Sequence, residues 1–346
     1  MIISKTPLRI SFFGGGTDYP AWFRENKGAV LSTSIDKYCY LTCRGLPPFF
    51  DHRFRVSYSV IELVRRVKEI RHPAVRGCLE HLGIRQGLEI HYDGDLPART
   101  GLGSSSSFTV GLLKCLFALK GKFVGNYQLA REAIRVEQEV IKENVGVQDQ
   151  MAASLGGFNF MEFGPDNRIS VQPFVMSPAQ ARGLNAHLLL FFTGFVRHAS
   201  EIAGDLVQNI PSRKSELKAT CQLAYEAAKI LGSPGKIKDF GKLLHEGWTI
   251  KKSLSNRIST PAVDEMYRLA RRSGATGGKL LGAGGGGFLL IFAPPESHKR
   301  IRQALRSFLH VPFSFENSGS QVVYYRQVEY EGWTTPVSGH RLLRGN

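Results

Sequence analysis

The stretch Asp-Leu-Pro-Ala-Arg-Thr-Gly-Leu-Gly-Ser-Ser-Ser-Ser, residues 95–107, is the most informative part of the chain. Its two glycines and four serines stand directly before an apolar run that continues to Leu119. Glycine lets backbone amides approach a ligand closely, and the helix predicted over Ser104–Leu119 would add unpaired N–H groups and the positive end of its dipole. These features indicate an anion site, most often one for phosphate. The alternative is a Gly/Ser loop that only caps a buried helix.

Length and composition bound the class of protein. A chain of 346 residues predicts two domains, and 42% hydrophobic with 21% charged residues is typical of a soluble globular protein. No run of about 18 apolar residues is present, so no transmembrane span is predicted. The segment Met1–Pro7 lacks a signal-peptide hydrophobic region, which predicts a cytoplasmic protein.

The charge is strongly positive, and cysteine use is sparse. A net charge of +16 admits nucleic acid, a membrane surface or anionic small molecules as partners. The basic residues are dispersed and no nucleic-acid-binding signature accompanies them, so we expect an anionic substrate and neither nucleic acid nor membrane as partner. The five cysteines form no Cys-x-x-Cys pair, which predicts free thiols rather than disulfides or a zinc site.

Strands and helices are mixed in both halves, which predicts an α+β fold. The pattern loosens around residues 173–183, where we place a boundary between domains 1–183 and 184–346. In the first half we expect strands at 8–13, 29–34, 37–44, 87–92 and 156–163, and helices at 73–82, 104–119 and about 129–141. In the second half we expect strands at 187–193, 288–292 and 321–328, and helices near 200–209, 213–231, 236–254, 261–273 and 297–309.

A second glycine-rich stretch, Gly282–Gly287, matches the pattern G-x-G-x-x-G. The dinucleotide fingerprint needs a strand before the glycines, a helix after them and an acidic residue about 20 positions on. Here a strand-like run follows the glycines, and the residues around Ser307 include no acid. A dehydrogenase is therefore excluded, and the absence of a G-x-x-x-x-G-K-[ST] sequence argues against an ordinary P-loop fold.

The remaining features suit phosphoryl transfer, which needs a phosphate cradle, a metal clamp and a group that positions the attacking hydroxyl. The loop at 101–106 can be the cradle, and Ser105 and Glu137 can offer the oxygen ligands that Mg²⁺ prefers. Asp149 can act as the base, with Arg9 as a fixed cation near the transferred charge. Each assignment has an alternative, because a lone acidic residue is more often a helix cap or a solvated side chain.

Three motifs in order resemble those of the GHMP kinase family, which includes galactokinase, homoserine kinase and mevalonate kinase. They are Pro7–Tyr19, Pro97–Ser106 and Lys279–Gly287, and the resemblance covers nearly the whole chain. Ser106 and Ser107 depart from the pattern, because many members have Ala there. The resemblance implies a two-domain GHMP kinase fold: an ATP-binding N-terminal domain with a left-handed βαβ unit, and a ferredoxin-like C-terminal domain.

The resemblance also implies cofactors and site residues. ATP and Mg²⁺ are expected, with Ser105 and Glu137 as metal ligands and Asp149 and Arg9 as catalytic residues. The nucleotide phosphates are expected at Pro97, Gly101, Leu102, Gly103, Ser104, Ser105 and Ser106. The acceptor substrate is expected at Gly16, Thr17, Asp18, Asp149, Arg197, Gly284 and Gly285.

The acceptor implied by the resemblance is a sugar phosphate. The segments 142–150, 193–199 and 277–281 are most similar to members that phosphorylate the anomeric hydroxyl of heptose 7-phosphate. Relatives that act on fucose or an octose 8-phosphate share much of these segments, so those acceptors stay open. Arg197 is the first candidate to bind the substrate phosphate and Lys252 the second. A sugar or nucleotide sensor without turnover is the alternative from another class, and a homodimer is left open.

Overall fold

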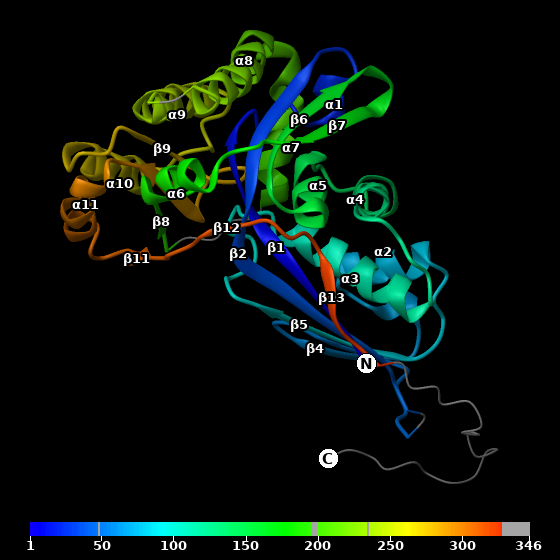
Figure 1. Ribbon diagram of the computed structural model, residues 1–346. Coiled ribbons are helices and arrows are strands. Elements are labelled where there is room, and N and C mark those ends of the chain that lie inside the picture. The colour runs from blue at the N-terminus through cyan, green and yellow to red at the C-terminus, as the bar shows by residue number, and fades with distance from the viewer. Residues whose placement is uncertain (48, 195–198, 234, 327–346) are drawn as a thin grey trace.

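The computed structural model describes residues 1–326 except positions 48, 195–198 and 234 (Figure 1). Within that part, nine strands form a large sheet with the order β13-β1-β2-β5-β3-β4. Strands β12 and β6 also pair with β2, and β7 pairs with β6. The strands are β1 (Ile2–Phe13), β2 (Gly28–Gly45), β3 (Phe54–Ser57), β4 (Ile61–Val64), β5 (Leu88–Gly94), β6 (Phe158–Gly164), β7 (Arg168–Pro173), β12 (Phe315–Glu316) and β13 (Gln321–Tyr325).

Strand β2 is the central strand of this sheet and pairs with four others. The sequence predicts two strands, 29–34 and 37–44, and the structure joins them into one. Along one edge β2 pairs with β1, and along the other it changes partner, from β6 over residues 28–33 to β5 over 39–45. Asp36 stands at this change of partner, where its polar side chain interrupts the apolar pattern in the sequence.

Helices pack on the large sheet, and one of its strand pairs is parallel. Strand β3 runs parallel to β5 with β4 and α2 between them in the chain, so a βαβ unit is present. Helix α3 is buried along most of its length and packs on β1 and β2. The helices of this half are α1 (Pro20–Phe23), α2 (Pro73–His81), α3 (Ser104–Leu119), α4 (Asn126–Arg135) and α5 (Gln148–Leu155), with a π-helical turn η2 (Val136–Val140) and short 3₁₀ turns at Val67–Glu69 and Pro165–Asn167.

The second half contains a four-stranded antiparallel sheet with the order β11-β8-β10-β9. In chain order these strands are four, one, three and two, which is the ferredoxin-like arrangement. The strands are β8 (Leu188–Phe192), β9 (Gly277–Leu280), β10 (Phe288–Phe292) and β11 (Leu309–His310). The helices are α6 (Pro178–Ala186), α7 (Ala199–Asn209), α8 (Lys214–Leu231), α9 (Ile237–Ser253), α10 (Pro261–Arg272) and α11 (His298–Ala304), with 3₁₀ turns at Ile210–Ser212 and Pro295–Ser297.

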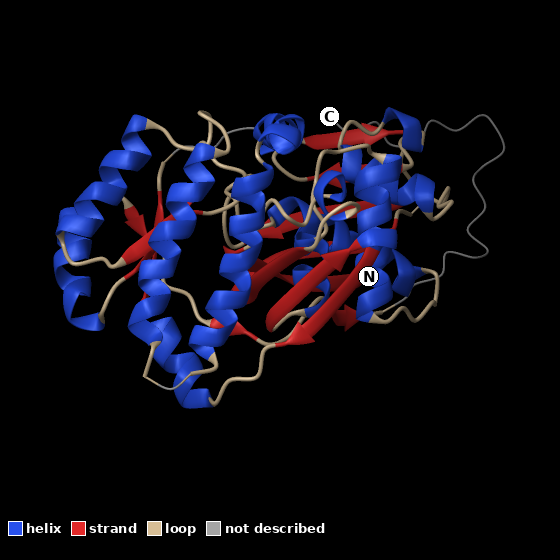
Figure 2. Ribbon diagram, turned by 90° about the horizontal axis from the view of Figure 1, so that it is seen from above, coloured by secondary structure: helices blue, strands red, loops and turns tan. Residues whose placement is uncertain are grey.

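The two halves share their hydrophobic core. Phe12 on β1 contacts Phe240 on α9 edge to face, with ring centroids 5.5 Å apart. Trp22 and Trp248, one from each half, are both fully buried in another cluster. Figure 2 shows the small sheet and its helices at one end of the molecule and the large sheet at the other. The α+β fold predicted from the sequence is confirmed, and two of its hydrophobic clusters contain residues from both halves.

The last described strand returns to the beginning of the chain. The strand predicted near 321–328 forms as β13, but it pairs with β1, with Tyr325 opposite Ile2. It therefore extends the large sheet rather than closing the small one (Figure 1). None of the helices in the described ranges is long and apolar enough to cross a membrane.

Candidate active site

Arg9 connects two of the predicted motifs directly. Its side chain lies on β1, is only 5% exposed, and donates from Nε and Nη2 to the two carboxylate oxygens of Asp149, each at 2.7 Å. Its third nitrogen, Nη1, donates to the carbonyl of Gly101 at 2.7 Å. Asp149 stands in the first turn of α5 and Gly101 in the loop before α3. One planar guanidinium thus joins the predicted base to the predicted phosphate loop.

The phosphate loop packs backbone to backbone against the second glycine-rich loop. A Cβ on Gly101, whose φ is +85°, would lie 2.4 Å from the carbonyl oxygen of Leu281. A Cβ on Gly282 would lie 2.4 Å from the Cα of Gly101. Only glycine fits at both positions, so these residues let the two loops meet. The predicted nucleotide loop and the third motif therefore form one surface.

Helix α3 begins directly behind this contact. Its first backbone hydrogen bond runs from the amide of Ser107 to the carbonyl of Gly103 at 2.9 Å. The amides before Ser107 have no helical acceptor, because a helix leaves its first N–H groups unpaired. Three contacts fix the loop: Leu102 O accepts from the amide of Arg9, Ser104 Oγ accepts from the amide of Arg99, and Pro97 O accepts from Thr100.

Asp18 lies beside Asp149 and is almost fully buried. Its Oδ1 accepts from the amide of Gly16 at 3.0 Å, and its Oδ2 from the amide of Gln148 at 3.3 Å. Burial, and next the negative charge of Asp149, raise the pKa of Asp18 above its ordinary value. Gly146 is required here, because a Cβ on it would lie 1.9 Å from the Asp18 carboxylate. Two carboxyl groups therefore meet at the start of α5.

Thr17, Gly284 and Gly285 shape the loops through their backbone contacts. The hydroxyl of Thr17 donates to the carbonyls of Gly14 and Ala29, at 2.8 and 3.1 Å. The amide of Gly285 donates to Ile258 O at 2.9 Å, and Gly284 packs against the same residue. Direct contact of Thr17, Gly284 and Gly285 with the substrate stays a prediction.

The structure describes only one of the two residues predicted to bind the substrate phosphate. Arg197 lies outside the described residues. Lys252 forms an ion pair with Asp264 at 3.2 Å, and its ammonium group stands 5.7 Å from the centre of the Trp248 ring. The ammonium group of Lys252 on α9 is therefore already paired with a carboxylate on α10.

Glu137, the predicted metal ligand, is 1% exposed and stands in the π-helical turn η2. Its Oε2 accepts from Ser106 Oγ at 2.9 Å and also from the side-chain amide of Gln150. Its Oε1 is buried without a hydrogen-bond partner in the described part of the chain. Burial is the main cause that raises the pKa of Glu137 to about 7. Ser105, the second predicted ligand, is exposed on the first turn of α3. The serine hydroxyl that is bonded to Glu137 is that of the next residue, Ser106.

Sequence reasoning assigned no role to three residues that the structure places around this site. Gln150 supports Glu137 from the same helix that holds Asp149. Lys251 on α9 donates to the carbonyls of Leu280 and Gly282, and Lys279 donates to Phe12 O. The sequence did indicate a special role for Lys279, because a lysine between glycines and leucines is unusual in a buried strand.

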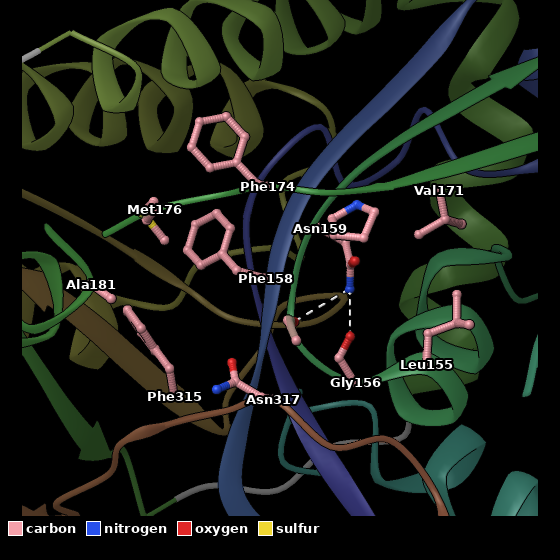
Figure 3. Close-up of a pocket in the computed structure, with 12 residues that line it drawn as sticks. Leu155, Gly156, Phe158, Asn159, Val171, Phe174, Met176, Ala181, Phe315 and Asn317 are labelled. Carbon is pink, nitrogen blue, oxygen red and sulfur yellow. Dashed lines mark hydrogen bonds between the residues drawn. The ribbon is translucent and has the colours of Figure 1, made fainter. Parts of the chain in front are cut away.

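A cavity of about 400 Å³ lies elsewhere, at the opposite end of α5 from Asp149 (Figure 3). Phe158, Phe174 and Phe315 line it together with the amide side chains of Asn159 and Asn317. No charged side chain lines it, and none of the residues around Arg9 takes part. This cavity is therefore separate from the candidate active site.

Comparisons with known proteins agree with this geometry. The family model for the GHMP kinases N terminal domain matches residues 63–157, and that for the GHMP kinases C terminal matches residues 215–311. The D-glycero-alpha-D-manno-heptose 7-phosphate kinase of Campylobacter jejuni is 32% identical over 320 residues, which cover 88% of this chain and 93% of that protein. The bifunctional fucokinase/GDP-fucose pyrophosphorylase of Arabidopsis thaliana is 28% identical, over 87% of this chain and 31% of that protein.

A solved structure supports the same fold. The D-glycero-D-manno-heptose 1-phosphate kinase of Bacteroides thetaiotaomicron superposes with a TM-score of 0.75 at 24% identity, over 94% of this chain and 100% of that one. The chain belongs to the GHMP kinase family. It is an ATP-dependent sugar kinase, a phosphotransferase with an alcohol group as acceptor.

Proposed function

We propose that this kinase transfers the γ-phosphoryl group of ATP to the anomeric C1 hydroxyl of D-glycero-D-manno-heptose 7-phosphate, which yields the 1,7-bisphosphate. The similarity to the heptose 7-phosphate kinase of Campylobacter jejuni over nearly the whole length of both chains supports this acceptor. The bidentate pair of Arg9 and Asp149 beside the phosphate loop is the single observation that supports the chemistry best.

The phosphate loop and the start of α3 would hold the phosphates of ATP. Backbone amides at a helix start, together with the positive end of the helix dipole, favour a phosphate group. The loop is held in place by Arg9 and by the glycine contact with the third motif. These contacts fix the backbone that would bind the phosphates.

Asp149 would accept the proton of the attacking hydroxyl. Both of its oxygens accept from Arg9 at 2.7 Å, and each carboxylate oxygen has a further lone pair for a substrate hydroxyl. Arg9 fixes the orientation of the carboxylate and ties it to Gly101. Arg9 would therefore fix the position of the base relative to the phosphate loop, which favours an aligned attack.

Mg²⁺ fits this site as an ion shared between protein and nucleotide. The buried Oε1 of Glu137 lacks a partner, and carboxylate oxygen is a preferred ligand of this ion. No group of three acidic, His or Cys side chains that could hold a metal occurs among the described residues. Glu137 and Ser105 would hold the ion, which would neutralise charge on the transferred phosphate.

A panel of acceptors tests this proposal. Purified protein, ATP and Mg²⁺ would be incubated with heptose 7-phosphate, the unphosphorylated heptose, an octose 8-phosphate, fucose and galactose while ADP release is measured. We expect the highest kcat/KM with heptose 7-phosphate. A higher value with fucose would favour the activity named for the Arabidopsis relative, and a higher value with the octose phosphate would also replace the acceptor assignment. ATP binding without turnover of any sugar would favour a sensor.

A further inference from the structure

Lys279 is a buried lysine that crosses the junction between the two halves. It belongs to β9 of the small sheet and is 8% exposed. Its Nζ donates to the carbonyl of Phe12 at 2.7 Å, and Phe12 belongs to β1 of the large sheet. The two residues are 267 positions apart in the chain. This hydrogen bond therefore ties the third motif to the first motif, near the end of β1.

The carbonyl that Lys279 holds is in an irregular part of the strand. Ser11 pairs with Ser32 and Phe13 pairs with Leu31, so the register of β1 against β2 shifts at Phe12. Phe12 is thus the extra residue of a bulge, and a bulge leaves one residue without its ladder partner. Lys279 supplies the missing donor. The loop Gly14–Asp18, which contains the buried carboxyl group of Asp18, begins two residues later.

The contact has an electrostatic cost. No ion pair to a carboxylate involves Lys279 or Lys251 in the described part of the chain. Burial, and next the positive charge of Arg9, lower the pKa of Lys279 to about 7. Lys251, which donates to Leu280 O and Gly282 O, adds a second cation nearby. An apolar side chain of similar length would fill this space without burying a cation, so packing alone does not account for a lysine.

We propose that Lys279 is a positioning residue for the acceptor: by holding the bulged carbonyl of Phe12 it fixes the loop Gly14–Asp18 against the second half. This inference rests on the proposed function, in which that loop binds the sugar. Asp18 in this loop is bonded to the amide of Gln148, the residue before Asp149. Displacing the loop would therefore move the sugar relative to the base while leaving the phosphate loop in place.

Kinetics of two variants and one control test the proposal in the full-length protein. Lys279→Met removes the donor and keeps the length, whereas Lys279→Arg keeps a donor. Lys242→Met is the matched control, because Lys242 is an exposed α9 residue paired only with Asp239. A charge-assisted hydrogen bond predicts that Lys279→Met raises the acceptor KM about 10- to 150-fold. The KM for ATP should change less than about threefold, and Lys279→Arg should recover part of the acceptor affinity.

Two further measurements separate positioning from a purely structural role. Lys279→Met removes a buried cation but also leaves the Phe12 carbonyl without its donor, so the two effects oppose each other and the melting temperature should stay close to that of the wild type. Hydrogen exchange of the backbone over residues 13–19 should become about tenfold faster in Lys279→Met, with residues 101–107 unchanged. Unchanged exchange at 13–19, a clear loss of thermal stability, or equal rises in both KM values would overturn the inference.

The exchange measurement needs no substrate, so it keeps this inference separate from the proposed function. A wild-type protein that phosphorylates none of the sugars would refute the proposed function. Faster exchange at 13–19 in Lys279→Met would still support the coupling between Lys279 and the loop.

Discussion

Replacing Asp149 by Asn tests the central pair of the site. The change removes the proton acceptor but keeps the size of the side chain. In the protein both oxygens of Asp149 accept from Arg9 at 2.7 Å, whereas Asn offers one oxygen and turns an NH₂ group toward a guanidinium donor. Loss of a positioned base predicts a fall in kcat of about 10²–10⁴. The KM for ATP should change little, because the Gly101 contact of Arg9 remains.

The structural cost of this variant can be worked out separately. Arg9 is 5% exposed, so it would lose a charge-assisted pair in a nearly dry position. Such bonds are worth about 1.5–3 kcal/mol, and since the Asp149 side chain is 25% exposed, we expect a loss of about 1–2 kcal/mol in unfolding free energy. Chemical denaturation measures this loss, and a coupled assay of ADP release measures kcat.

A matched control isolates the chemistry. Asp239→Asn removes a carboxylate from an exposed ion pair with Lys242 and should leave kcat unchanged. A folded Asp149→Asn protein with kcat within about threefold of the wild type would refute the assignment of Asp149 as base. In that case the residue would serve to orient Arg9.

Four further variants test the metal site and the acceptor loop. The pKa of Glu137 is about 7 in the folded protein and 4.5 in the unfolded chain. The folded state therefore holds this proton more tightly, and its contribution to the free energy of unfolding is complete below pH 4.5 and is lost as the pH rises to about 7. With a metal chelator present, the free energy of unfolding of the wild type should therefore fall by about 2–3 kcal/mol more than that of Glu137→Gln between about pH 5 and 8. If the free energy of unfolding of both proteins changes equally with pH, the raised pKa is contradicted. Ser105→Ala should raise the Mg²⁺ concentration for half-maximal activity about tenfold, whereas Ser106→Ala should mainly lower thermal stability; the reverse would make Ser106 the ligand. Asp18→Ala should raise the acceptor KM about 10- to 150-fold with little effect on the KM for ATP, and equal rises in both would argue against sugar binding.

Local sequence patterns predicted most of the elements that hold the site. The helix predicted over Ser104–Leu119 forms as α3 with the same bounds, because glycines and serines precede one long apolar run. Strand β7 was not expected, since its side chains are mostly exposed and its pattern therefore lacks a clear apolar face. The pairing of β13 with β1 joins positions more than 300 residues apart, which no local pattern indicates.

The candidate site was predictable in its parts but not in its contacts. Arg9, Asp149 and Glu137 were proposed from residue type and family motifs. The bonds from Arg9 to Asp149 and from Ser106 to Glu137 depend on tertiary packing. The sequence could not show which of the adjacent serines faces Glu137, because neighbouring helix positions point about 100° apart and the side of α3 on which Glu137 lies depends on tertiary packing. The bond from Lys279 to Phe12 was not predictable, since it depends on a bulge in β1.

The most direct test of the proposed reaction is the position of the new phosphate. The product formed from heptose 7-phosphate and ATP would be examined by proton–phosphorus correlation NMR. We predict a second phosphorus signal that couples to the anomeric proton, together with one ADP for each phosphate transferred. A phosphorus that couples to any other ring proton, or ADP release without a second phosphoester, would contradict the proposed transfer to C1.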